Sequence, residues 1–204
     1  MEIYLVRHGQ TGGNVAHRHQ AEDTQLSFIG EQQVREVAEL IKQYEPTHLV
    51  TSNLVRAIET SRIICDACDL IPETNHNFIE LVRPKNMYGH HHKSIKSIWF
   101  YFQWLLGKDS NITNGGESYE TLRERFLLAQ DYLKQYPKDA KVVVVSHAAF
   151  IGLFVAHLCR KKALNPLEAA FVFHKILTMP NTHIIKLRLN TESDTGICAW
   201  SLDN

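Results

Sequence analysis

The sequence predicts an α/β fold: a three-layer α/β/α sandwich with a mostly parallel sheet and a capping insertion over the C-terminal edge of that sheet. Short apolar segments, typical of buried strands, alternate with longer segments in which apolar residues recur every three or four positions, as in amphipathic helices. Such alternation is typical of parallel sheets flanked by helices. In addition, arginine or histidine residues follow three of the apolar segments, at the sheet edge where ligands bind in such folds.

The individual elements follow from these patterns. The run of four valines before Ser146 predicts a strand buried on both faces, because parallel strands covered by helices are continuously apolar. Another strand is expected over residues 1–6 (MEIYLV), and a short one is expected to end near Thr51. Further strands are expected over residues 170–174, 182–189 and 196–202. Helices are expected over residues 27–44, 53–69, 117–136 and 148–161, and Ser52 or Asn53 is expected to cap the second of them.

Length and charge indicate one domain of ordinary enzyme size. The 204 residues predict a single domain, 1–204, with a cap insertion at about 81–116. Lys plus Arg and Asp plus Glu are 22 each, so the net charge is zero, and with no basic face evident we expect no nucleic-acid partner. The apolar N-terminus is shorter than a signal peptide, and no run reaches the roughly 18 apolar residues of a membrane helix. We therefore expect a cytoplasmic protein without a membrane partner.

Four side chains are expected to meet at one edge of the sheet. Arg7 and His8 follow the first strand. Arg56 lies in the first turn of the helix after the second strand, and His147 follows the valine run. The carboxyl ends of parallel strands share an edge, so these residues would lie together. A metal site is the first alternative for two histidines, but two guanidinium groups would repel a cation and instead favour a phosphate.

A phosphate site of this composition suggests a reaction. The helix that begins at about Ala148 presents backbone N–H groups and the positive end of its dipole, so Ala148 is expected to contact the substrate. One imidazole can attack phosphorus as a covalent nucleophile, and the other can donate hydrogen bonds to charge that develops on the phosphoryl oxygens. The sequence contains no cysteine-nucleophile phosphatase pattern, no Walker loop and no G-x-S-x-G elbow.

The motifs that carry these residues resemble those of the histidine phosphatase superfamily, also called phosphoglycerate mutase-like. They occur in order over roughly residues 2–190 as LVRHGQTGGNVAHRHQ, DTQLSFIGEQQ, TSNLVRAIET, FIEL, NGGESYETLRERF and VVVVSHAAF. The resemblance implies chemistry that needs neither a metal nor an organic cofactor. It also implies that the substrate is a phosphorylated molecule, and a small one is expected here.

The resemblance implies roles for individual residues. His8 would be the nucleophile that becomes phosphohistidine, and Glu80 in FIEL would donate a proton to the leaving group. The other residues implied for the phosphate pocket are Arg7, Arg56 and His147. The residues implied to lie near the substrate are Asn14, Thr11 and Gln20. Three other carboxylates compete with Glu80 for the role of acid, namely Glu36, Glu59 and Glu117.

Two departures from the family pattern bear on function. Ala21 stands where relatives often have glycine, which affects a local turn rather than the chemistry. The stretch after Glu80 lacks the paired arginines and serine with which cofactor-dependent mutases hold a second acidic group. We therefore expect a metal-independent phosphomonoesterase. A phosphoglycerate mutase and a non-catalytic phosphate- or phosphopeptide-binding protein stay open as alternatives, and so does a homodimer.

Three further features invite a functional interpretation. Cys65 and Cys68 form a C-x-x-C within the helix expected over 53–69, and with no second such pair we expect two reduced thiols. The three consecutive histidines at 90–92 are expected in a solvated loop, with substrate contact as the weaker alternative. The aromatic run at 98–106 is expected to form a helix packed over the pocket or on a partner.

Overall fold

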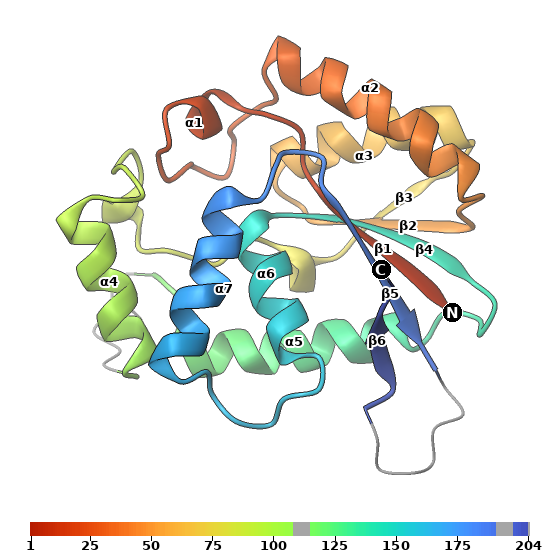
Figure 1. The fold of residues 1–204 in the computed structure, drawn as a ribbon. Helices are drawn as coiled ribbons and strands as arrows, with labels where there is room; N and C mark the ends of the chain where they lie inside the picture. The colour runs from red at the N-terminus through yellow and green to blue at the C-terminus, as the bar shows by residue number, and fades with distance from the viewer. Residues whose placement is uncertain (108–114, 191–197, 204) are drawn as a thin grey trace.

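The computed structural model describes residues 1–107, 115–190 and 198–203, which form a six-stranded sheet flanked by helices (Figure 1). The strands are β1 (Glu2–Arg7), β2 (His48–Thr51), β3 (Pro72–Thr74), β4 (Lys141–Ser146), β5 (Ile184–Leu189) and β6 (Trp200–Leu202). The α-helices are α1 (Gly12–Val15), α2 (Phe28–Gln43), α3 (Val55–Cys68), α4 (Ile95–Leu105), α5 (Tyr119–Leu133), α6 (Ala148–His157) and α7 (Pro166–Thr178). The 3₁₀ turns are η1 (His76–Phe78) and η2 (Lys85–Met87).

The order of the strands brings the expected site residues to one edge. The strands lie in the order β3-β2-β4-β1-β5-β6. All pairings among β1, β2, β3 and β4 are parallel. β5 runs antiparallel to its two neighbours, β1 and β6. Arg7 at the end of β1 pairs with Ser146 at the end of β4, and Thr51 at the end of β2 pairs with Val145. The carboxyl ends of these three strands therefore meet at the same edge, as the sequence predicts.

Helices cover both faces of the sheet because successive strand residues face opposite sides. In β1, Ile3 and Leu5 pack with residues of α5 and α6, whereas Tyr4 and Val6 pack with residues of α2 and α3. Figure 1 shows α2 and α3 on one side of the sheet and α5, α6 and α7 on the other. Burying each such aliphatic side chain stabilises the fold by about 1.5–3 kcal/mol. The predicted α/β/α sandwich with a mostly parallel sheet is confirmed.

Four expected helices are confirmed as α2, α3, α5 and α6, each at or inside the predicted limits. The cap of α3 differs from the prediction. Its N-cap residue is Leu54, whose side chain makes no capping hydrogen bond. Ser52 Oγ accepts a hydrogen bond from the Leu54 backbone N–H (3.2 Å) and also contacts the His147 ring. Ser52 therefore links the start of α3 to the candidate site.

The strand expected over residues 170–174 is wrong, because those residues lie within α7. Asn165 caps this helix: its side chain accepts a hydrogen bond from the Glu168 backbone, and the Glu168 side chain accepts one from the Asn165 backbone. Pro166 occupies the first turn, where its missing N–H costs nothing. These start signals outweigh the aromatic and β-branched run that suggested a strand.

The remaining expectations concern the last two strands and the insertion. β5 and β6 confirm the strands expected over 182–189 and 196–202, although residues 196 and 197 lie outside the described residues. In the segment 81–116 the structure describes η2 and α4, and residues 108–114 lie outside it. The described chain contains no helix with both the length and the apolarity needed to cross a membrane. Helix α4 packs beside α7, with the rings of Tyr101 and Phe173 4.9 Å apart (Figure 1).

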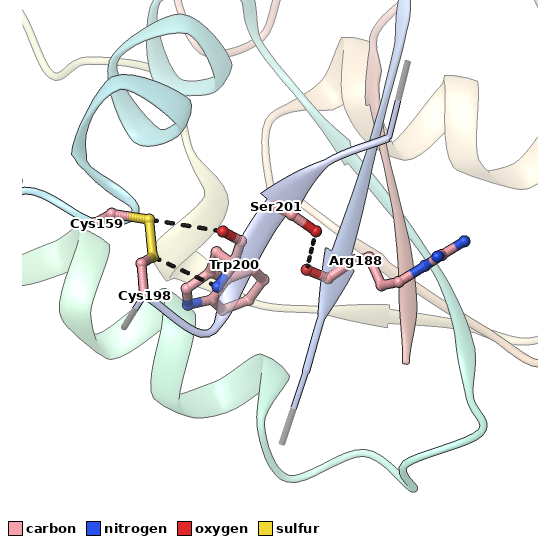
Figure 2. Close-up of a disulfide and its surroundings, with 5 residues drawn as sticks. All are labelled: Cys159, Arg188, Cys198, Trp200 and Ser201. Atoms are coloured by element: carbon pink, nitrogen blue, oxygen red, sulfur yellow. Dashed lines mark hydrogen bonds between the residues drawn. A yellow bond between two sulfur atoms is a disulfide. The ribbon is translucent and has the colours of Figure 1, made fainter. Parts of the chain in front are cut away.

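A disulfide joins Cys159, just after α6, to Cys198, just before β6 (Figure 2). Their Cα atoms lie 5.3 Å apart, although 39 positions separate them in sequence. The spacing of the cysteines in the sequence did not predict this pair. It does not show that the segment before β6 lies beside the end of α6. Cys65 and Cys68 are free thiols, as expected. Burial raises the pKa of Cys65 to about 12, so this thiol stays protonated at neutral pH.

Candidate active site

His8 lies just beyond the carboxyl end of β1, in a backbone position fixed on both sides. Its backbone N–H donates to Ser146 O at the end of β4 (3.0 Å), and its carbonyl accepts from Asn181 Nδ2 (3.1 Å). Gly9 follows where the chain passes against α2: a Cβ there would lie 2.7 Å from Gly30 O, closer than real Cβ contacts. A glycine at this position therefore lets α2 pack directly against the turn that carries His8.

The imidazole of His8 is fixed in one orientation and one tautomer. Nδ1 donates to the Gly9 carbonyl (2.7 Å), so the proton of the neutral ring sits on Nδ1 and the lone pair on Nε2. Burial lowers the pKa of His8 well below its ordinary value, and the positive charges of Arg56 and Arg7 lower it further. The ring is therefore neutral at physiological pH, the form in which imidazole is a nucleophile.

His147 stands beside His8, with ring centroids 5.1 Å apart. It is the N-cap residue of α6, and its Nε2 lies 2.8 Å from Ser52 Oγ. Burial lowers the pKa of His147 well below its ordinary value, and the positive charge of Arg56 lowers it further. This ring is therefore also neutral at physiological pH. Within the described residues its Nδ1 is buried and has no hydrogen-bond partner.

Two guanidinium groups complete the cluster expected from the sequence. Arg7 donates to the Met179 carbonyl, and Arg56 Nη1 donates to the Ala21 carbonyl (3.0 Å). Burial lowers the pKa of Arg56 to about 10, which leaves the group charged at neutral pH. In the described chain, Arg7 Nε and Arg56 Nε are buried without an acceptor, like His147 Nδ1. Buried donors normally have partners, and an oxyanion would supply acceptors for such a set.

Glu80 reaches this cluster from the segment after η1. Its carboxylate accepts hydrogen bonds from the backbone N–H groups of Leu81 (2.8 Å) and Phe150 (3.1 Å), with Ala149 N at 3.5 Å. The carboxylate therefore sits at the N-terminus of α6, where the helix dipole favours negative charge. This corrects one expectation: Glu80 accepts hydrogen bonds from N–H groups that were expected to bind the phosphate, whereas Ala148 and Ala149 of this turn line the cavity.

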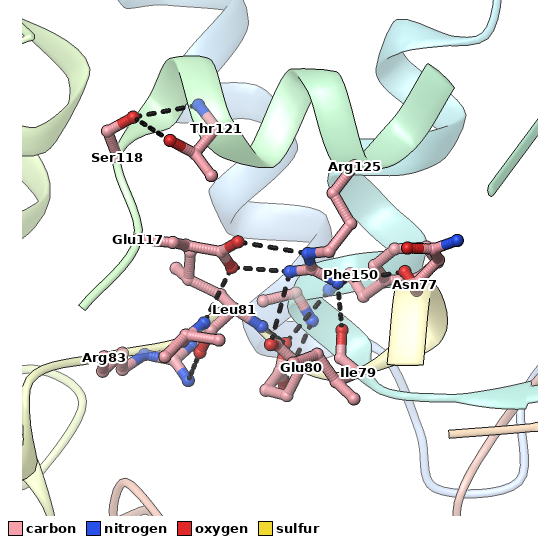
Figure 3. A network of polar contacts seen from close by, with 12 residues as sticks. Asn77, Ile79, Glu80, Leu81, Arg83, Glu117, Ser118, Thr121, Arg125 and Phe150 are labelled. Carbon is pink, nitrogen blue, oxygen red and sulfur yellow. Dashed lines mark hydrogen bonds and ion pairs between the residues drawn. The ribbon is translucent and has the colours of Figure 1, made fainter. Parts of the chain in front are cut away.

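A buried ion pair supports the Glu80 segment from behind (Figure 3). Arg125 Nη2 lies 2.5 Å from Glu117 Oε1, and both side chains are less than 10% exposed. Arg125 Nη1 donates to the carbonyls of Asn77 (3.1 Å) and Ile79 (2.8 Å), and Glu117 accepts from the Val82 backbone (2.8 Å). Glu117 therefore holds the loop in place and is not a free carboxylate.

The other carboxylates that compete with Glu80 lie away from the cluster. Glu59 accepts a hydrogen bond from the Leu26 backbone (2.7 Å), and Glu36 is exposed on α2. Neither lines the cavity described next. Glu80 is thus the carboxylate that the structure brings together with the histidines and arginines.

A cavity of about 530 Å³ opens over the cluster. The expected residues in its lining are Arg7, His8, Asn14, Gln20, Arg56, Glu80 and Ala148. His147 is not part of the lining, although its ring neighbours that of His8. Thr11 is also outside the lining: it is fully buried, and its hydroxyl contacts Gln20 Oε1 (2.7 Å) and caps α1. Thr11 therefore supports two cavity residues and does not face the cavity itself.

Several cavity residues were not predicted as site residues. Asn181 Nδ2 donates to both His8 O and Asn14 Oδ1, each at 3.1 Å, and no local motif marks it. Arg18, Arg83 and Lys93 add positive charge to the lining. His17, for which the sequence predicted no function, also lines the cavity.

The histidine run and the aromatic run both reach this cavity. His92 lines it, whereas His91 is exposed. Among the described residues, no group of three or more His, Cys, Asp or Glu side chains is placed to hold a metal ion. Helix α4 contributes Ile98 and Tyr101 to the cavity wall, which agrees with the expectation of a helix packed over the pocket.

The family model of the histidine phosphatase superfamily (branch 1) matches residues 3–194. The chain belongs to this superfamily. A probable phosphoglycerate mutase GpmB of Yersinia enterocolitica is 31% identical over 164 residues, which cover 78% of this chain and 74% of that protein. A probable GpmB of Yersinia pestis is 32% identical over the same shares.

Solved structures show the same fold as this histidine phosphatase. A protein described as mycobacterial hydrolase 1 is 25% identical with a TM-score of 0.76, covering 100% of this chain and 97% of that one. A phosphoserine phosphatase of Entamoeba histolytica, in complex with phosphoserine, is 24% identical with a TM-score of 0.77, covering 100% and 95%. The family membership confirms the resemblance drawn from the motifs and, at the level of the superfamily, the expectation of a phosphoric monoester hydrolase.

Proposed function

We propose that this protein is a metal-independent phosphomonoesterase that hydrolyses a small phosphorylated substrate through a phosphohistidine on His8. The observation that carries the proposal is the cluster of buried nitrogens around His8. Three buried nitrogens without partners among the described residues, on Arg7, Arg56 and His147, lie near an imidazole whose Nδ1–H is fixed by Gly9. This arrangement suits a phosphoryl group held in line with Nε2 of His8.

In the proposed reaction, Nε2 of His8 attacks phosphorus and the bond to the ester oxygen breaks. Glu80 passes a proton to the departing oxygen. Water then attacks the phosphohistidine, loses a proton to the Glu80 carboxylate, and releases inorganic phosphate and neutral His8. Arg7, Arg56 and His147 stabilise the charge on the phosphoryl oxygens in both steps.

We assign substrate contacts to the rim of the cavity. Asn14, Gln20 and the Ala148 backbone line it, and Thr11 acts indirectly by holding Gln20. The two guanidiniums supply the positive charge that a metal ion brings to other phosphatases, so the proposal includes no metal and no organic cofactor. A single domain with a cap over 81–116, a cytoplasmic location and the absence of nucleic-acid and membrane partners are parts of the same proposal.

A phosphoglycerate mutase is the second candidate, favoured by the 31–32% identity to proteins named probable phosphoglycerate mutases. A mutase must hold the product so that phosphate returns to it instead of passing to water. The sequence after Glu80 lacks the paired arginines that hold the product in cofactor-dependent mutases. A non-catalytic phosphate or phosphopeptide binder is less well supported, since binding alone needs neither a nucleophile nor an acid.

The decisive experiment measures phosphate release from p-nitrophenyl phosphate, sugar phosphates, nucleotides and phosphoamino acids. We expect wild-type turnover, and His8→Ala should lose essentially all of it. His174→Ala, which removes an exposed imidazole from α7, is the matched control and should keep full activity. A radiolabelled ester, quenched without acid, should label His8. Full turnover in His8→Ala would contradict the mechanism, and net isomerisation of 3-phosphoglycerate without phosphate release would favour the mutase.

A further inference from the structure

Ser52 lies directly beyond the carboxyl end of β2, and a backbone hydrogen bond sets it beside the end of β4. Its backbone N–H donates to the carbonyl of Val145 (3.0 Å), two residues before His147. The side chains of Ser52 and His147 are both fully buried. Because the two strand ends are joined here, Ser52 Oγ lies 2.8 Å from Nε2 of His147. This contact connects the hydroxyl to the cluster proposed to bind phosphate.

The hydroxyl of Ser52 has one proton to donate and two lone pairs that can accept hydrogen bonds. One lone pair accepts from the backbone N–H of Leu54 (3.2 Å). In the part of the chain that the structure describes, the only other hydrogen bond of this hydroxyl is the one to His147, and no carbonyl or carboxylate accepts its proton. Buried hydroxyl groups normally have an acceptor. The acceptor for the Ser52 proton is therefore Nε2 of His147.

This contact decides which nitrogen of His147 carries the proton. Burial and the charge of Arg56 lower the pKa of His147 well below its ordinary value, so the ring is neutral and carries one proton. If Nε2 accepts from Ser52, that proton lies on Nδ1. The opposite tautomer would leave the Ser52 proton without an acceptor and would place a bare lone pair on the buried Nδ1. The hydrogen bonds of Ser52 thus favour the tautomer with Nδ1–H.

Nδ1 of His147 is the atom through which this tautomer bears on the reaction. Like Nε of Arg7 and Nε of Arg56, it is buried and has no partner among the described residues. The ring that carries it neighbours the ring of His8, with 5.1 Å between their centroids. The oxygens of a dianionic phosphoryl group only accept hydrogen bonds, so an N–H at this position binds them whereas a bare nitrogen repels them. The tautomer therefore matters for binding of the phosphoryl group.

We propose that Ser52 is a positioning residue for the reaction at His8: its hydroxyl donates to Nε2 of His147 and holds the proton on Nδ1, which donates it to a phosphoryl oxygen. This inference rests on the proposed function. Ser52 is not part of the cavity lining, so it acts through His147 and does not touch the substrate. In His8 the Gly9 carbonyl likewise holds the proton on Nδ1. The same tautomer gives the two rings different tasks, because His8 reacts through its bare Nε2 and His147 binds through Nδ1–H.

The first test examines the wild-type protein with ¹⁵N-labelled histidines. A long-range ¹H–¹⁵N correlation spectrum at neutral pH shows which ring nitrogens carry protons, and the His147→Gln variant identifies the signals of His147. We expect a protonated Nδ1 and a bare Nε2. Addition of inorganic phosphate should shift the Nδ1 signal more than the Nε2 signal. A proton on Nε2 would overturn the inference, whatever the turnover of the protein.

The second test measures what the contact contributes to turnover of p-nitrophenyl phosphate. Ser52→Ala should lower kcat/KM about 10- to 100-fold, the usual effect of losing a hydrogen bond to a charged group, here the one from Nδ1 to the phosphoryl oxygen. Ser52→Thr keeps the hydroxyl and should restore most of the activity. Ser61→Ala is the matched control and should keep full activity. It removes an equally buried hydroxyl, which donates to the Ile58 carbonyl (2.8 Å) within α3.

The two tests together separate positioning from mere structure. Equal losses in Ser52→Ala and Ser52→Thr, with Nδ1 of His147 still protonated in both, would show a structural role and overturn the inference. Full turnover in Ser52→Ala would also overturn it. If Ser52→Ala does not fold, the wild-type spectrum decides. A wild-type protein that shows the expected tautomer but hydrolyses no ester would overturn the proposed function and not the hydrogen bond.

Discussion

Glu117 and Arg125 form an ion pair behind the loop of Glu80, with 2.5 Å between Oε1 and Nη2. The pair lies across several backbone groups of that loop: Arg125 donates to the carbonyls of Asn77 and Ile79, and Glu117 accepts from Val82 N. Asn77, Ile79 and Val82 are thus held by hydrogen bonds to two side chains that do not line the cavity. The position of the proposed acid depends on a contact made on the opposite side of its own backbone.

Arg125→Met should therefore destabilise the protein and lower activity together. It leaves the Glu117 carboxylate buried without its partner, which typically costs about 3–5 kcal/mol in the free energy of unfolding. Urea unfolding and turnover of an alkyl phosphate measure the two effects. Arg35→Met, which removes the exposed ion pair with Glu31, is the control and should change stability by less than about 1 kcal/mol. Unchanged stability in Arg125→Met would contradict the supporting role of the pair.

Glu80→Gln should slow poor leaving groups far more than good ones. General acids typically contribute about 10²–10⁴-fold, so an alkyl phosphate should lose activity by that order. An aryl phosphate leaves with little need for a proton and should be affected much less. Comparing kcat for the two esters measures the difference. Equal slowing of both would mean that Glu80 is not the proton donor.

The pH dependence should reflect the depressed pKa of His8. An ordinary histidine nucleophile loses activity as the pH falls through about 6.5, because its ring becomes protonated. Burial, with the charges of Arg56 and Arg7, lowers the pKa of His8 well below that value, so its neutral form persists into acid. We expect no loss of kcat/KM between pH 7.5 and about 6, after correction for titration of the substrate. An enzyme-derived acid limb centred near 6.5 would contradict this.

Activity should survive exhaustive chelation. Arg7 and Arg56 supply positive charge at the proposed phosphoryl site, where a metal ion would otherwise be needed. Phosphate release measured before and after dialysis against EDTA should agree within error, with a metal-dependent phosphatase in the same buffer as the positive control. Loss of activity that zinc or manganese restores would point to a metal at the histidines instead.

Reduction of the Cys159–Cys198 bond should lower stability without lowering turnover. A disulfide of this loop length stabilises a protein by about 2–4 kcal/mol, mainly through the unfolded chain. The bond lies at the far end of α6 from His147, so the site should keep its geometry. Urea unfolding with and without reductant measures the loss. The double variant Cys159→Ser/Cys198→Ser should show no response to reductant, and a reductant effect that persists in it would assign the effect elsewhere.

The sequence predicted the central site because that part depends on local rules. Arg7, Arg56 and His147 each follow a strand, and parallel strands bring their carboxyl ends together. Helix α7 was not predicted because a short, mainly apolar run fits a strand as well as a helix, although Asn165 and Pro166 carry a helix start signal.

Contacts between distant segments escaped sequence reasoning. Asn181 bonds to His8 across 173 positions, and the link between Arg83 and Tyr101 depends on where α4 settles. The Glu80 carboxylate was expected to serve the leaving group, but its hydrogen bonds to the start of α6 follow from tertiary packing. Such contacts have no local signature, because they arise only once the layers are assembled.

The covalent link at Cys198 has a consequence for how copies of the protein meet one another. β6 is a strand of three residues at the margin of the sheet, and it pairs with Leu187–Leu189, the second half of the outer edge of β5. An uncovered edge of that kind is a template onto which another chain can add a strand. The bond joins Cys198, two residues before β6, to the end of α6, so we expect it to keep β6 in place on β5 and to limit the addition of a strand from another copy.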